Sequence, residues 1–498
     1  MDHAEDSSRV TPDLDGALAA FALAVGAANV CTAADELVAA QCATFATTQR
    51  IPAIVSPQNR QEVQACLRIA NQFRVPVYPT STGKNWGYGS RVPVRSGSVL
   101  LSLRRLDRIV TFDERLAYVT LEPGVTFQML HTFLRQQQSQ RILWGTGSSA
   151  QTSIIGNTLE RGLGRGPAAD RWQRVCALEV VLPTGECATT GFARYPGARA
   201  PALHRAGDGP ALDGLFTQSN LGVVTQMTVW LDTAPAVCQR AAFVLRSPAQ
   251  LEDAINALRE LLLPETLRLS MSLINPERIR AVNRPYPGIS WLGEGVLSSS
   301  SPAAAQAEQQ TMAAALGPHV DRLWFEPRPA HPELLGEDAL APAYAAKPRG
   351  ATERSANPDP DRDRCGLLVF APVLPFDGAA VSEALRLLEE VAAPRGFQPG
   401  VSLRCITPRV LYLVGSLVYD RNVPGEDERA AACHHALHTR LAAAGFFPYR
   451  LGLADQATPL PCQDDSAALL QSIKQLVDPS DILAPGRYDF RSGWRGEK

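Results

Sequence analysis

The segment from Gly145 to Gly166, GTGSSAQTSIIGNTLERGLGRG, constrains the fold most, because glycine, serine and threonine surround only one short helical piece. Glycine lacks the Cβ atom that keeps neighbouring groups apart, so this backbone can lie flat against a large planar ligand. The segment does not match the Rossmann fingerprint, since its glycines do not open a long helix directly after a strand and no acidic residue follows at the expected distance. Binding of NAD through that motif is therefore not expected.

A second bare segment, PTSTGKNWGYGS, runs from Pro79 to Ser90 directly after a predicted strand at 75–79. Small residues in this position let consecutive backbone N–H groups turn inward around an anion, and Lys84 adds a positive charge. A phosphate or pyrophosphate suits that geometry. A solvent-exposed glycine turn is the alternative, and this motif alone does not decide between the two.

The hydrophobic periodicity predicts an α+β chain with a change of composition at Thr233. The expected helices lie at 14–43, from Ser56-Pro57 onward, and at 248–262, 379–391 and 426–444. A hairpin is expected at 175–190, and strands are expected at 223–231, 366–373 and 411–419. Two exposed polar loops are expected at Ser298–Gln310 and Arg354–Arg364. We expect a cofactor domain built from both chain ends, residues 1–236 and 447–498, with a cap domain, residues 237–446, inserted between them.

The balance of charge and apolar residues excludes several classes of partner. The chain has 48 Lys and Arg against 50 Asp and Glu, so no basic field points to nucleic acid or to an anionic membrane. No apolar run reaches the roughly 18 residues that a membrane-spanning helix needs. The N-terminus, MDHAEDSSRVTPD, is unlike a signal peptide, and the ten cysteines form no CxxC pair. These features predict a cytoplasmic protein with free thiols.

Eight stretches occur in this order between about Ile51 and Arg487: STGKNWGYGS, LEPGVTFQMLHTFL, IIGNTLERGLG, LEVVLPTGE, GLFTQSNLGVVT, LVYDRN, FPYR and VDPSDILAPGR. Through them the chain resembles the FAD-linked oxidoreductase family of vanillyl-alcohol oxidase and 4-cresol dehydrogenase (p-cresol methylhydroxylase). The eight stretches together are specific to this family, whereas any single stretch is weak evidence for it. The resemblance implies a two-domain FAD-binding fold of the PCMH type, with an inserted α+β cap domain and the flavin ring at the junction.

The resemblance also implies which residues bind FAD. By their positions in the matched stretches, they are Ser81, Thr82, Gly83, Lys84 and Asn85 around the pyrophosphate, Gly156, Asn157, Glu160, Gly162 and Gly164 along the flavin, and Val224, Thr225 and Arg487 elsewhere on the cofactor. Ser148 takes the place near the flavin N5 where the oxidases carry an acidic residue. For Arg487, a solvated C-terminal arginine is the alternative.

Tyr88, Tyr449 and Arg450 match the two tyrosines and the arginine that hold the substrate's phenolate oxygen in the phenol-oxidising relatives. An arginine and two hydroxyl donors stabilise an anion and lower the pKa of a phenol. Loss of a hydride from the benzylic carbon then gives a neutral quinone methide, and the flavin N5 accepts the hydride. The resemblance therefore implies that these three residues form the catalytic set, although an isolated Tyr-Arg pair is more typical of a surface.

The sequence departs from the family at the acid–base and flavin-attachment positions. A glutamate and a histidine line the pocket of 4-cresol dehydrogenase, and the matching positions here are Leu403 and Tyr412. The groups expected to activate water for hydroxylation are thus missing. No histidine or tyrosine stands shortly before Leu368–Pro372, where relatives attach the flavin, and Cys365 is expected to be a buried thiol. FAD is therefore predicted to bind non-covalently.

Three histidines, His434, His435 and His438, lie close together on a predicted helix, with His434 and His438 one turn apart. A metal site is one interpretation of this spacing. The sequence places no third ligand beside them, so we expect a solvated helix face and no metal.

The leading prediction is an enzyme that transfers a hydride from a small aromatic substrate, a 4-substituted phenol or benzylic alcohol, to FAD. Oxygen or another electron acceptor, which the sequence does not identify, would re-oxidise the flavin. Two alternatives stay open: a biosynthetic flavin oxidase that desaturates or cyclises a natural-product intermediate, and a flavin-binding scaffold without catalysis. A homodimer is a further expectation, because homologous folds often dimerise. No residue pattern in the sequence marks an interface.

Overall fold

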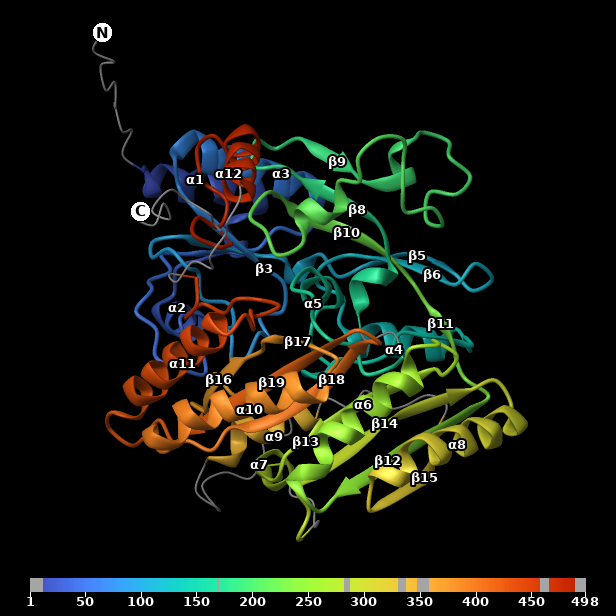
Figure 1. The fold of residues 1–498 in the computed structure, drawn as a ribbon. Coiled ribbons are helices and arrows are strands. Elements are labelled where there is room, and N and C mark those ends of the chain that lie inside the picture. Colours follow the sequence, from blue (N-terminus) through green and yellow to red (C-terminus); the bar gives the residue numbers. More distant parts are fainter. Residues whose placement is uncertain are drawn as a thin grey trace.

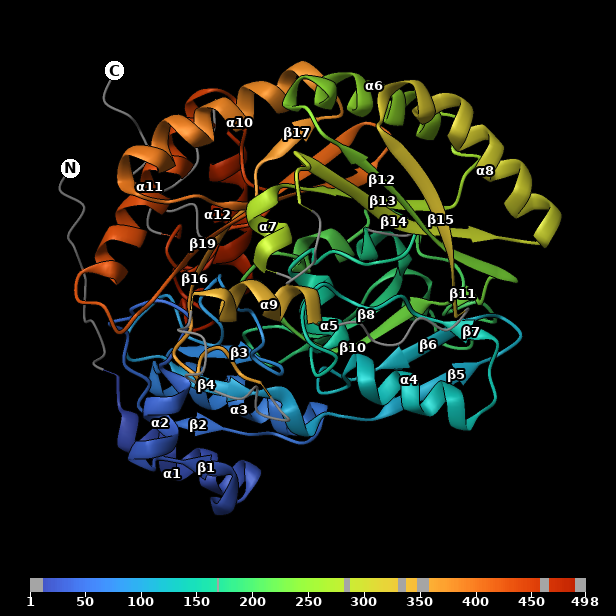
Figure 2. The ribbon, with the colours of Figure 1, turned by 90° about the horizontal axis from the view of Figure 1, so that it is seen from below.

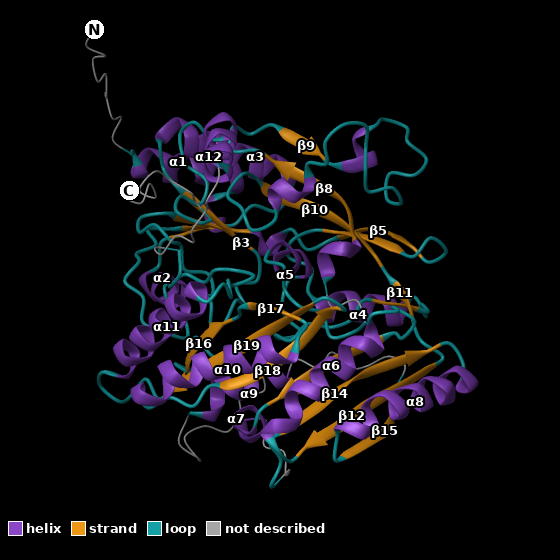
Figure 3. Ribbon diagram, in the orientation of Figure 1, coloured by secondary structure: helices purple, strands orange, loops and turns teal. Residues whose placement is uncertain are grey.

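The computed structural model describes residues 12–167, 170–281, 287–329, 337–346, 358–456 and 465–488. These residues form an α+β structure, as predicted (Figure 1). Two smaller sheets lie in the upper half of Figure 1, and one large sheet lies in the lower half. Figure 3 shows most helices along the upper and lower margins of the molecule, with loops and short helices between its two halves.

The two smaller sheets come from the first half of the chain. Their strands are β1 (Val30–Cys31), β2 (Ile54–Val55), β3 (Val77–Thr80), β4 (Val99–Ser102), β5 (Ile109–Asp113), β6 (Tyr118–Leu121), β8 (Val175–Val181), β9 (Cys187–Thr189) and β10 (Val223–Trp230). The first sheet has the order β1-β2-β4-β3, and the antiparallel second sheet has the order β5-β6-β10-β8-β9. The predicted hairpin at 175–190 and strand at 223–231 are confirmed. A separate strand pair is formed by β7 (Arg141–Ile142) and β11 (Asp232–Thr233).

Six helices accompany these sheets: α1 (Leu14–Val25), α2 (Ala34–Ala40), α3 (Arg60–Phe73), α4 (Phe127–Gln136), α5 (Ile154–Leu159) and α12 (Ser466–Val477). The long N-terminal helix that was predicted is therefore two helices, with Gly26 at φ +85° after the first. The helix predicted from Pro57 begins at Arg60, because the Asn59 side chain caps it by accepting from Glu62 N–H at 2.9 Å. Among the described residues, no helix is long and apolar enough to cross a membrane.

The large sheet is antiparallel and has eight strands. They are β12 (Val237–Leu245), β13 (Leu269–Ile274), β14 (Trp291–Ser299), β15 (Arg322–Arg328), β16 (Gly366–Phe370), β17 (Val373–Pro375), β18 (Gly400–Thr407) and β19 (Val410–Tyr419). Their order is β15-β12-β14-β13-β18-β19-β16, and β17 also pairs with β19. Four helices, α6 (Leu251–Leu262), α8 (Pro302–Leu316), α10 (Gly378–Ala392) and α11 (Glu426–Ala443), arc along the outer side of this sheet in Figure 2. Two shorter helices, α7 (Pro276–Ala281) and α9 (Glu337–Ala345), pack beside β18 and β19 respectively.

Side chains alternate between the two faces of the large sheet, as in any strand. On β18, Val401, Leu403 and Cys405 are buried in the core between the sheet and its helices. Ser402 and Arg404 lie on the opposite face, which lines a cavity. The sheet therefore presents an apolar side to the helices and a polar side to the other half of the molecule.

The C-terminal segment returns to the first sheet. Val77 N–H donates to Ile482 O, and Val77 O accepts from Ala484 N–H, both at 2.8 Å. The buried Lys474 ammonium holds this segment in place by donating to Leu483 O at 2.9 Å. Both ends of the described chain thus build one part of the fold. The predicted domain boundaries stay predictions.

The stretch 298–310 was predicted as an exposed loop, and this is wrong. It is the end of β14 and the start of α8. Ser301 Oγ accepts from Ala304 N–H at 3.1 Å, and Pro302 is the first helical residue. A serine cap followed by proline is a strong helix start, and the alanine and glutamine that follow favour helix without an apolar face.

Candidate active site

A cleft of about 170 Å³, hereafter the cofactor cleft, lies between the bare-backbone segments. Its walls come from the loop after β3, from α5, from the residues around the start of β10 and from the C-terminal return. The predicted FAD-binding residues that line it are Ser81, Thr82, Gly83, Lys84, Asn85, Gly156, Asn157, Glu160, Val224 and Arg487. The structure therefore brings together residues that are more than 400 positions apart in the sequence, as the pairing of Arg487 with Tyr78 at a separation of 409 shows.

The two bare segments contact each other directly at the cleft. Thr82 Oγ1 accepts from Ser153 N–H at 2.9 Å, and Ser153 Oγ in turn accepts from Gly156 N–H at 2.9 Å, which caps α5. A Cβ atom at Gly156 would lie 2.3 Å from Ser81 Oγ, closer than atoms can approach. A side chain at position 156 would therefore force the Ser81 hydroxyl out of its place in the cleft.

Several polar atoms of the cleft are buried and lack a hydrogen-bond partner among the described residues. They are Thr152 Oγ1, Asn157 Oδ1 and Ser219 Oγ, each belonging to a lining residue. Buried polar groups are rarely left without partners. A ligand such as FAD, which carries phosphates, hydroxyls and ring heteroatoms, supplies donors and acceptors for atoms of this kind. The residues present therefore fit the cofactor that the sequence predicts.

Glu160 and Arg487 meet at one side of the cleft. Arg487 forms an ion pair with Glu160 and donates to Tyr78 OH at 3.0 Å, and Tyr488 OH donates to Glu160 Oε2 at 3.1 Å. Burial alone would lower the pKa of Arg487, but the charge of Glu160 raises that pKa above its ordinary value. Arg487 is thus a fixed cation and not a solvated C-terminal arginine. Sequence reasoning missed Tyr78 and Tyr488, which no local motif singles out.

Four predicted cofactor residues lie outside the cleft. Ser148 and Gly162 line the neighbouring cavity described below. Gly164 accepts from Arg404 Nη2 at 2.9 Å through its carbonyl oxygen. Thr225 points its hydroxyl at Glu179 Oε1, 2.7 Å away, because neighbouring residues of β10 face opposite sides of the sheet. The Thr225 side chain therefore contributes to packing between β10 and β8.

A second hollow of about 630 Å³, hereafter the cap-sheet cavity, separates the glycine-rich loop from the polar face of the large sheet. Lys84, Asn85, Asn157 and Arg450 line both hollows, so the two are adjacent. This is the position at which a ligand in the cleft and a ligand in the cavity would meet.

The predicted catalytic residues Tyr88, Tyr449 and Arg450 all line the cap-sheet cavity. The Arg450 Cζ atom lies 3.6 Å from the centre of the Tyr88 ring and 5.6 Å from that of Tyr449. Burial raises the pKa of Tyr449 well above its ordinary value, although the charge of Arg450 opposes this. Tyr449 also stacks on Tyr412, with ring centres 4.4 Å apart. The structure thus brings the three residues together at the junction and adds Tyr412 as a neighbour.

Gly87 fixes the approach of the Tyr88 loop to the cap sheet. Its φ is +81°, and a Cβ atom there would lie 2.4 Å from Val369 Cγ2 on β16. Val369 N–H donates to Gly87 O at 3.1 Å. The loop therefore lies against the edge of the large sheet, which positions Tyr88 opposite residues from the distant segment that contains Arg450.

The cap-sheet cavity is rich in positive charge, a property that sequence reasoning missed. Its lining arginines are Arg165, Arg240, Arg278, Arg328, Arg404 and Arg450, and the one lining carboxylate among the described residues is Glu294. Glu294 is bound to Arg240 at 2.9 Å. Leu403, which was matched to an acid–base position, faces the helices and is fully buried, whereas its neighbour Arg404 faces the cavity. The correction follows from alternation along β18, a strand that was not predicted.

The segment 354–364 was predicted as an exposed loop without a role; residues 354–357 lie outside the described residues. The rest is a loop, as predicted, but only Arg362 and Arg364 in it are exposed. Asp359 binds Lys84 Nζ at 2.6 Å, and Asp361 accepts from Ser90 Oγ at 2.9 Å. Burial raises the pKa of Asp361 to about 7. The segment therefore contacts the loop after β3, and the charge of Lys84 is engaged by a carboxylate.

Of the three histidines on α11, only His435 is exposed to solvent, as was predicted. His434 and His438 are buried, and His434 Nε2 lies 3.2 Å from Val369 O. His434 Nδ1 lies 3.5 Å from Asp455, a residue that accepts from Gly452 N–H at 2.9 Å. Among the described residues, no group of three histidine, cysteine or acidic side chains could hold a metal ion. The histidines instead lie behind the loop that carries Arg450.

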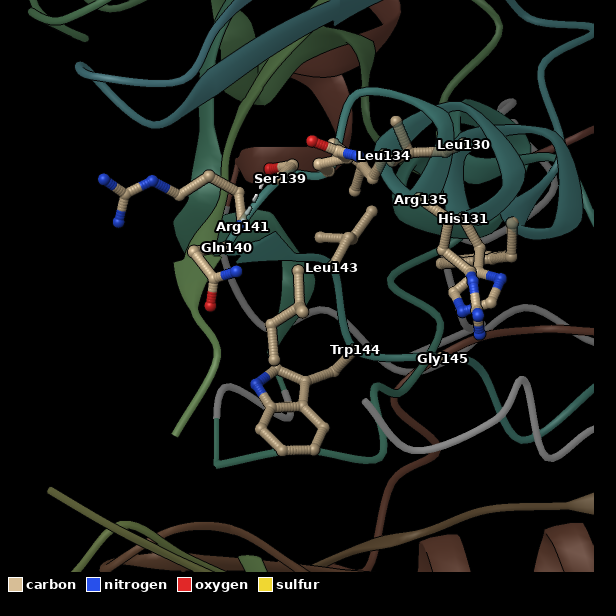
Figure 4. A pocket seen from close by; sticks show the side chains of 13 residues that line it. Leu130, His131, Leu134, Arg135, Ser139, Gln140, Arg141, Leu143, Trp144 and Gly145 are labelled. Carbon is tan, nitrogen blue, oxygen red and sulfur yellow. Dashed lines mark hydrogen bonds between the residues drawn. The ribbon is translucent and has the colours of Figure 1, made fainter. Parts of the chain in front are cut away.

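A third hollow, of about 300 Å³, lies beside α4 (Figure 4). Leu130, Leu134 and Leu143 give it an apolar wall, and Trp144 forms the side that it shares with the cap-sheet cavity. It contains none of the predicted site residues. We assign it no role in the site.

The chain is similar in sequence to known proteins. The sequence model of the FAD binding domain matches residues 51–191. The chain is 43% identical over 535 residues to the 1'-carboxy-chondrochloren decarboxylase of Chondromyces crocatus, covering 97% of this chain and 99% of that protein. It is 28% identical to the flavoprotein subunit of the hydroxylating 4-cresol dehydrogenase of Pseudomonas putida, covering 87% of each.

Two solved structures share the whole fold. The structure of p-cresol methylhydroxylase with substrate bound superposes with a TM-score of 0.85 at 25% identity and covers 95% of this chain and 96% of its own. The 4-ethylphenol oxidase of Gulosibacter chungangensis in complex with isoeugenol superposes with a TM-score of 0.83 at 22% identity and covers 96% and 97%. The fold that the sequence predicts is therefore confirmed.

Proposed function

Because the chain belongs to the p-cresol methylhydroxylase-type family of FAD-linked oxidoreductases, we propose that it oxidises a para-substituted phenol at the benzylic carbon. The observation that carries this proposal is the position of Arg450. Its guanidinium lies 3.6 Å from the Tyr88 ring and lines both the cofactor cleft and the cap-sheet cavity. Its Nε is buried without a hydrogen-bond partner among the described residues, so a substrate oxygen can complete its bonding.

The three residues would act on the charge of the substrate. A guanidinium and two phenolic hydroxyls favour the anionic form of a bound phenol, so its pKa falls. When a hydride leaves the benzylic carbon, the phenolate oxygen supplies the electron pair that forms the quinone methide. FAD, when bound, supplies the hydride acceptor. Tyr88, Tyr449 and Arg450 hold the oxygen and thereby orient the carbon toward the cleft.

A second candidate, oxidative decarboxylation, is favoured by the name of the relative with 43% identity and by the arginines of the cavity. If the carbon next to the benzylic carbon bears a carboxylate, the quinone methide can lose CO₂. The electron pair of the broken C–C bond then forms the alkene, and the ring regains its aromaticity as phenolate. This route needs no activated water, which agrees with a cavity whose described lining has no histidine and only one carboxylate, Glu294. It is one form of the biosynthetic desaturation considered above.

Anaerobic mixing of the holoenzyme with substrates tests the proposal. We expect loss of the visible absorption of oxidised flavin with 3-(4-hydroxyphenyl)propanoate or 4-ethylphenol, and no change with the corresponding O-methyl ethers, which cannot form a phenolate. Release of labelled CO₂ from the carboxyl-labelled acid would select decarboxylation over simple dehydrogenation. Flavin that stays oxidised with every para-substituted phenol would rule out the proposed function.

A further inference from the structure

We infer that Arg404 forms a carboxylate-binding subsite on the floor of the cap-sheet cavity, so that the substrate is a phenol with an acidic side chain. This inference rests on the proposed function only for the position of the phenol ring. It names a substrate class that the phenol-binding residues alone do not require.

The first observation is the local charge. The whole chain has a net charge of −2, yet the described residues that line this cavity include six arginines and a single carboxylate. A hollow lined by one sign of charge focuses its field and concentrates ligands of the opposite sign. Such a field does not attract a neutral 4-alkylphenol, whereas it attracts a carboxylate.

The second observation is the strand register, which places Arg404 beside the phenol-binding residues. Arg404 pairs with Tyr412 on β19, and Tyr412 stacks on Tyr449 with ring centres 4.4 Å apart. Adjacent strands are about 4.8 Å apart, so Arg404 stands one strand from the aromatic pair. On its other side Arg404 pairs with Ser272 of β13. The cation therefore lies along the floor, next to the predicted ring position.

The third observation is the position of the Arg404 guanidinium across the cavity. Its Nη2 donates to Gly164 O at 2.9 Å, so the guanidinium spans from the sheet to the glycine-rich loop. A planar guanidinium held in this way can pair with a carboxylate through parallel N–H bonds, which a lysine cannot reproduce.

Equilibrium binding to the oxidised holoenzyme tests the subsite without turnover. The probes are 4-hydroxycinnamate and 4-hydroxycinnamamide, which differ in one charge and have no saturated benzylic carbon to oxidise. By calorimetry we expect the wild-type protein to bind the acid at least about tenfold more tightly than the amide, as one charge-assisted hydrogen bond would give. In Arg404→Gln this preference should fall to near one, and in Arg404→Lys it should be partly restored.

Arg322→Gln is the matched control, because it removes the same charge from an exposed position of β15 that does not line the cavity. We expect the acid preference to survive this change. Equal binding of acid and amide by the wild-type protein would overturn the inference, as would a preference that persists in Arg404→Gln. If Arg404→Gln does not fold, the wild-type ratio and Arg404→Lys still decide.

Flavin reduction separates failure of the subsite from failure of the proposed function. Reduction at equal efficiency by 3-(4-hydroxyphenyl)propanoate and its amide, in wild type and in Arg404→Gln alike, would leave the function standing and overturn the subsite. Selective binding of 4-hydroxycinnamate without reduction by any phenol would support the subsite and overturn the proposed function.

Discussion

Arg487 forms an ion pair with Glu160, a residue 327 positions earlier in the chain. The pair joins the C-terminal return to the end of α5 on one wall of the cofactor cleft. Both side chains are largely buried, with 11% and 22% of their surfaces exposed. Its loss should therefore affect both stability and cofactor binding.

Glu160→Gln should destabilise the protein by about 2–3 kcal/mol, somewhat less than the cost of breaking a fully buried pair, because Arg487 is left without its counter-charge. Chemical denaturation measures this change, and gel filtration measures the FAD that is retained. Glu186→Gln, at an exposed turn, is the control and should leave both unchanged. Wild-type stability and full FAD retention in Glu160→Gln would contradict the prediction.

Arg450→Met should slow anaerobic flavin reduction by a 4-substituted phenol at least about 100-fold, the loss typical when a donor to a developing oxyanion is removed. Stopped-flow absorbance measures the rate. Tyr412→Phe keeps the ring that stacks on Tyr449 and removes only a hydroxyl, so its rate should stay close to that of the wild type. A rate in Arg450→Met close to wild type would show that the guanidinium does not act on the substrate.

Asp361 should make stability depend on pH. Burial raises its pKa to about 7 in the folded protein, above the value of about 3.9 for an exposed aspartate, so the folded state holds the proton more tightly. The contribution of Asp361 is thus fully present below about pH 4 and is lost as the pH rises toward 7. Asp361→Asn should remove this part of the pH dependence of the melting temperature. An identical pH profile in the variant would contradict the prediction.

FAD should be released when the protein is denatured. No histidine or tyrosine lies at 358–364 in the part of the chain that the structure describes, and Cys365 is buried in a cluster with Leu367 and Ala343. After acid precipitation, the yellow colour should therefore appear in the supernatant. Colour that stays with the pellet after washing would show a covalent bond.

The sequence predicted the parts of the site that depend on short motifs. The loop of Ser81–Asn85, the turn at Gly156 and the pair Tyr449-Arg450 are each defined by a few consecutive residues. The structure brings them together around the cofactor cleft and the cap-sheet cavity, and their roles stay predictions. Residues that depend on strand register were not predicted. Because β18 was not recognised, Leu403 was matched to the cavity where Arg404 actually stands, and a shift of one residue moves a side chain to the other face.

Long-range contacts account for the remaining errors. Asp359 and His434 occur in stretches whose composition is typical of exposed segments, and nothing local reveals their partners. Asp359 forms an ion pair with Lys84, and His434 contacts a backbone carbonyl and Asp455. Local patterns report which face of an element is apolar, but they do not report which distant element covers it.

The return of residues 482–484 to β3 has a consequence for synthesis of the protein. One wall of the cofactor cleft is translated before the large sheet and another after it. A ribosome-bound chain that stops before Leu483 has the first bare segment but cannot close around FAD. Cofactor capture is therefore expected only after residue 484 has been made, and the first half must stay soluble until then.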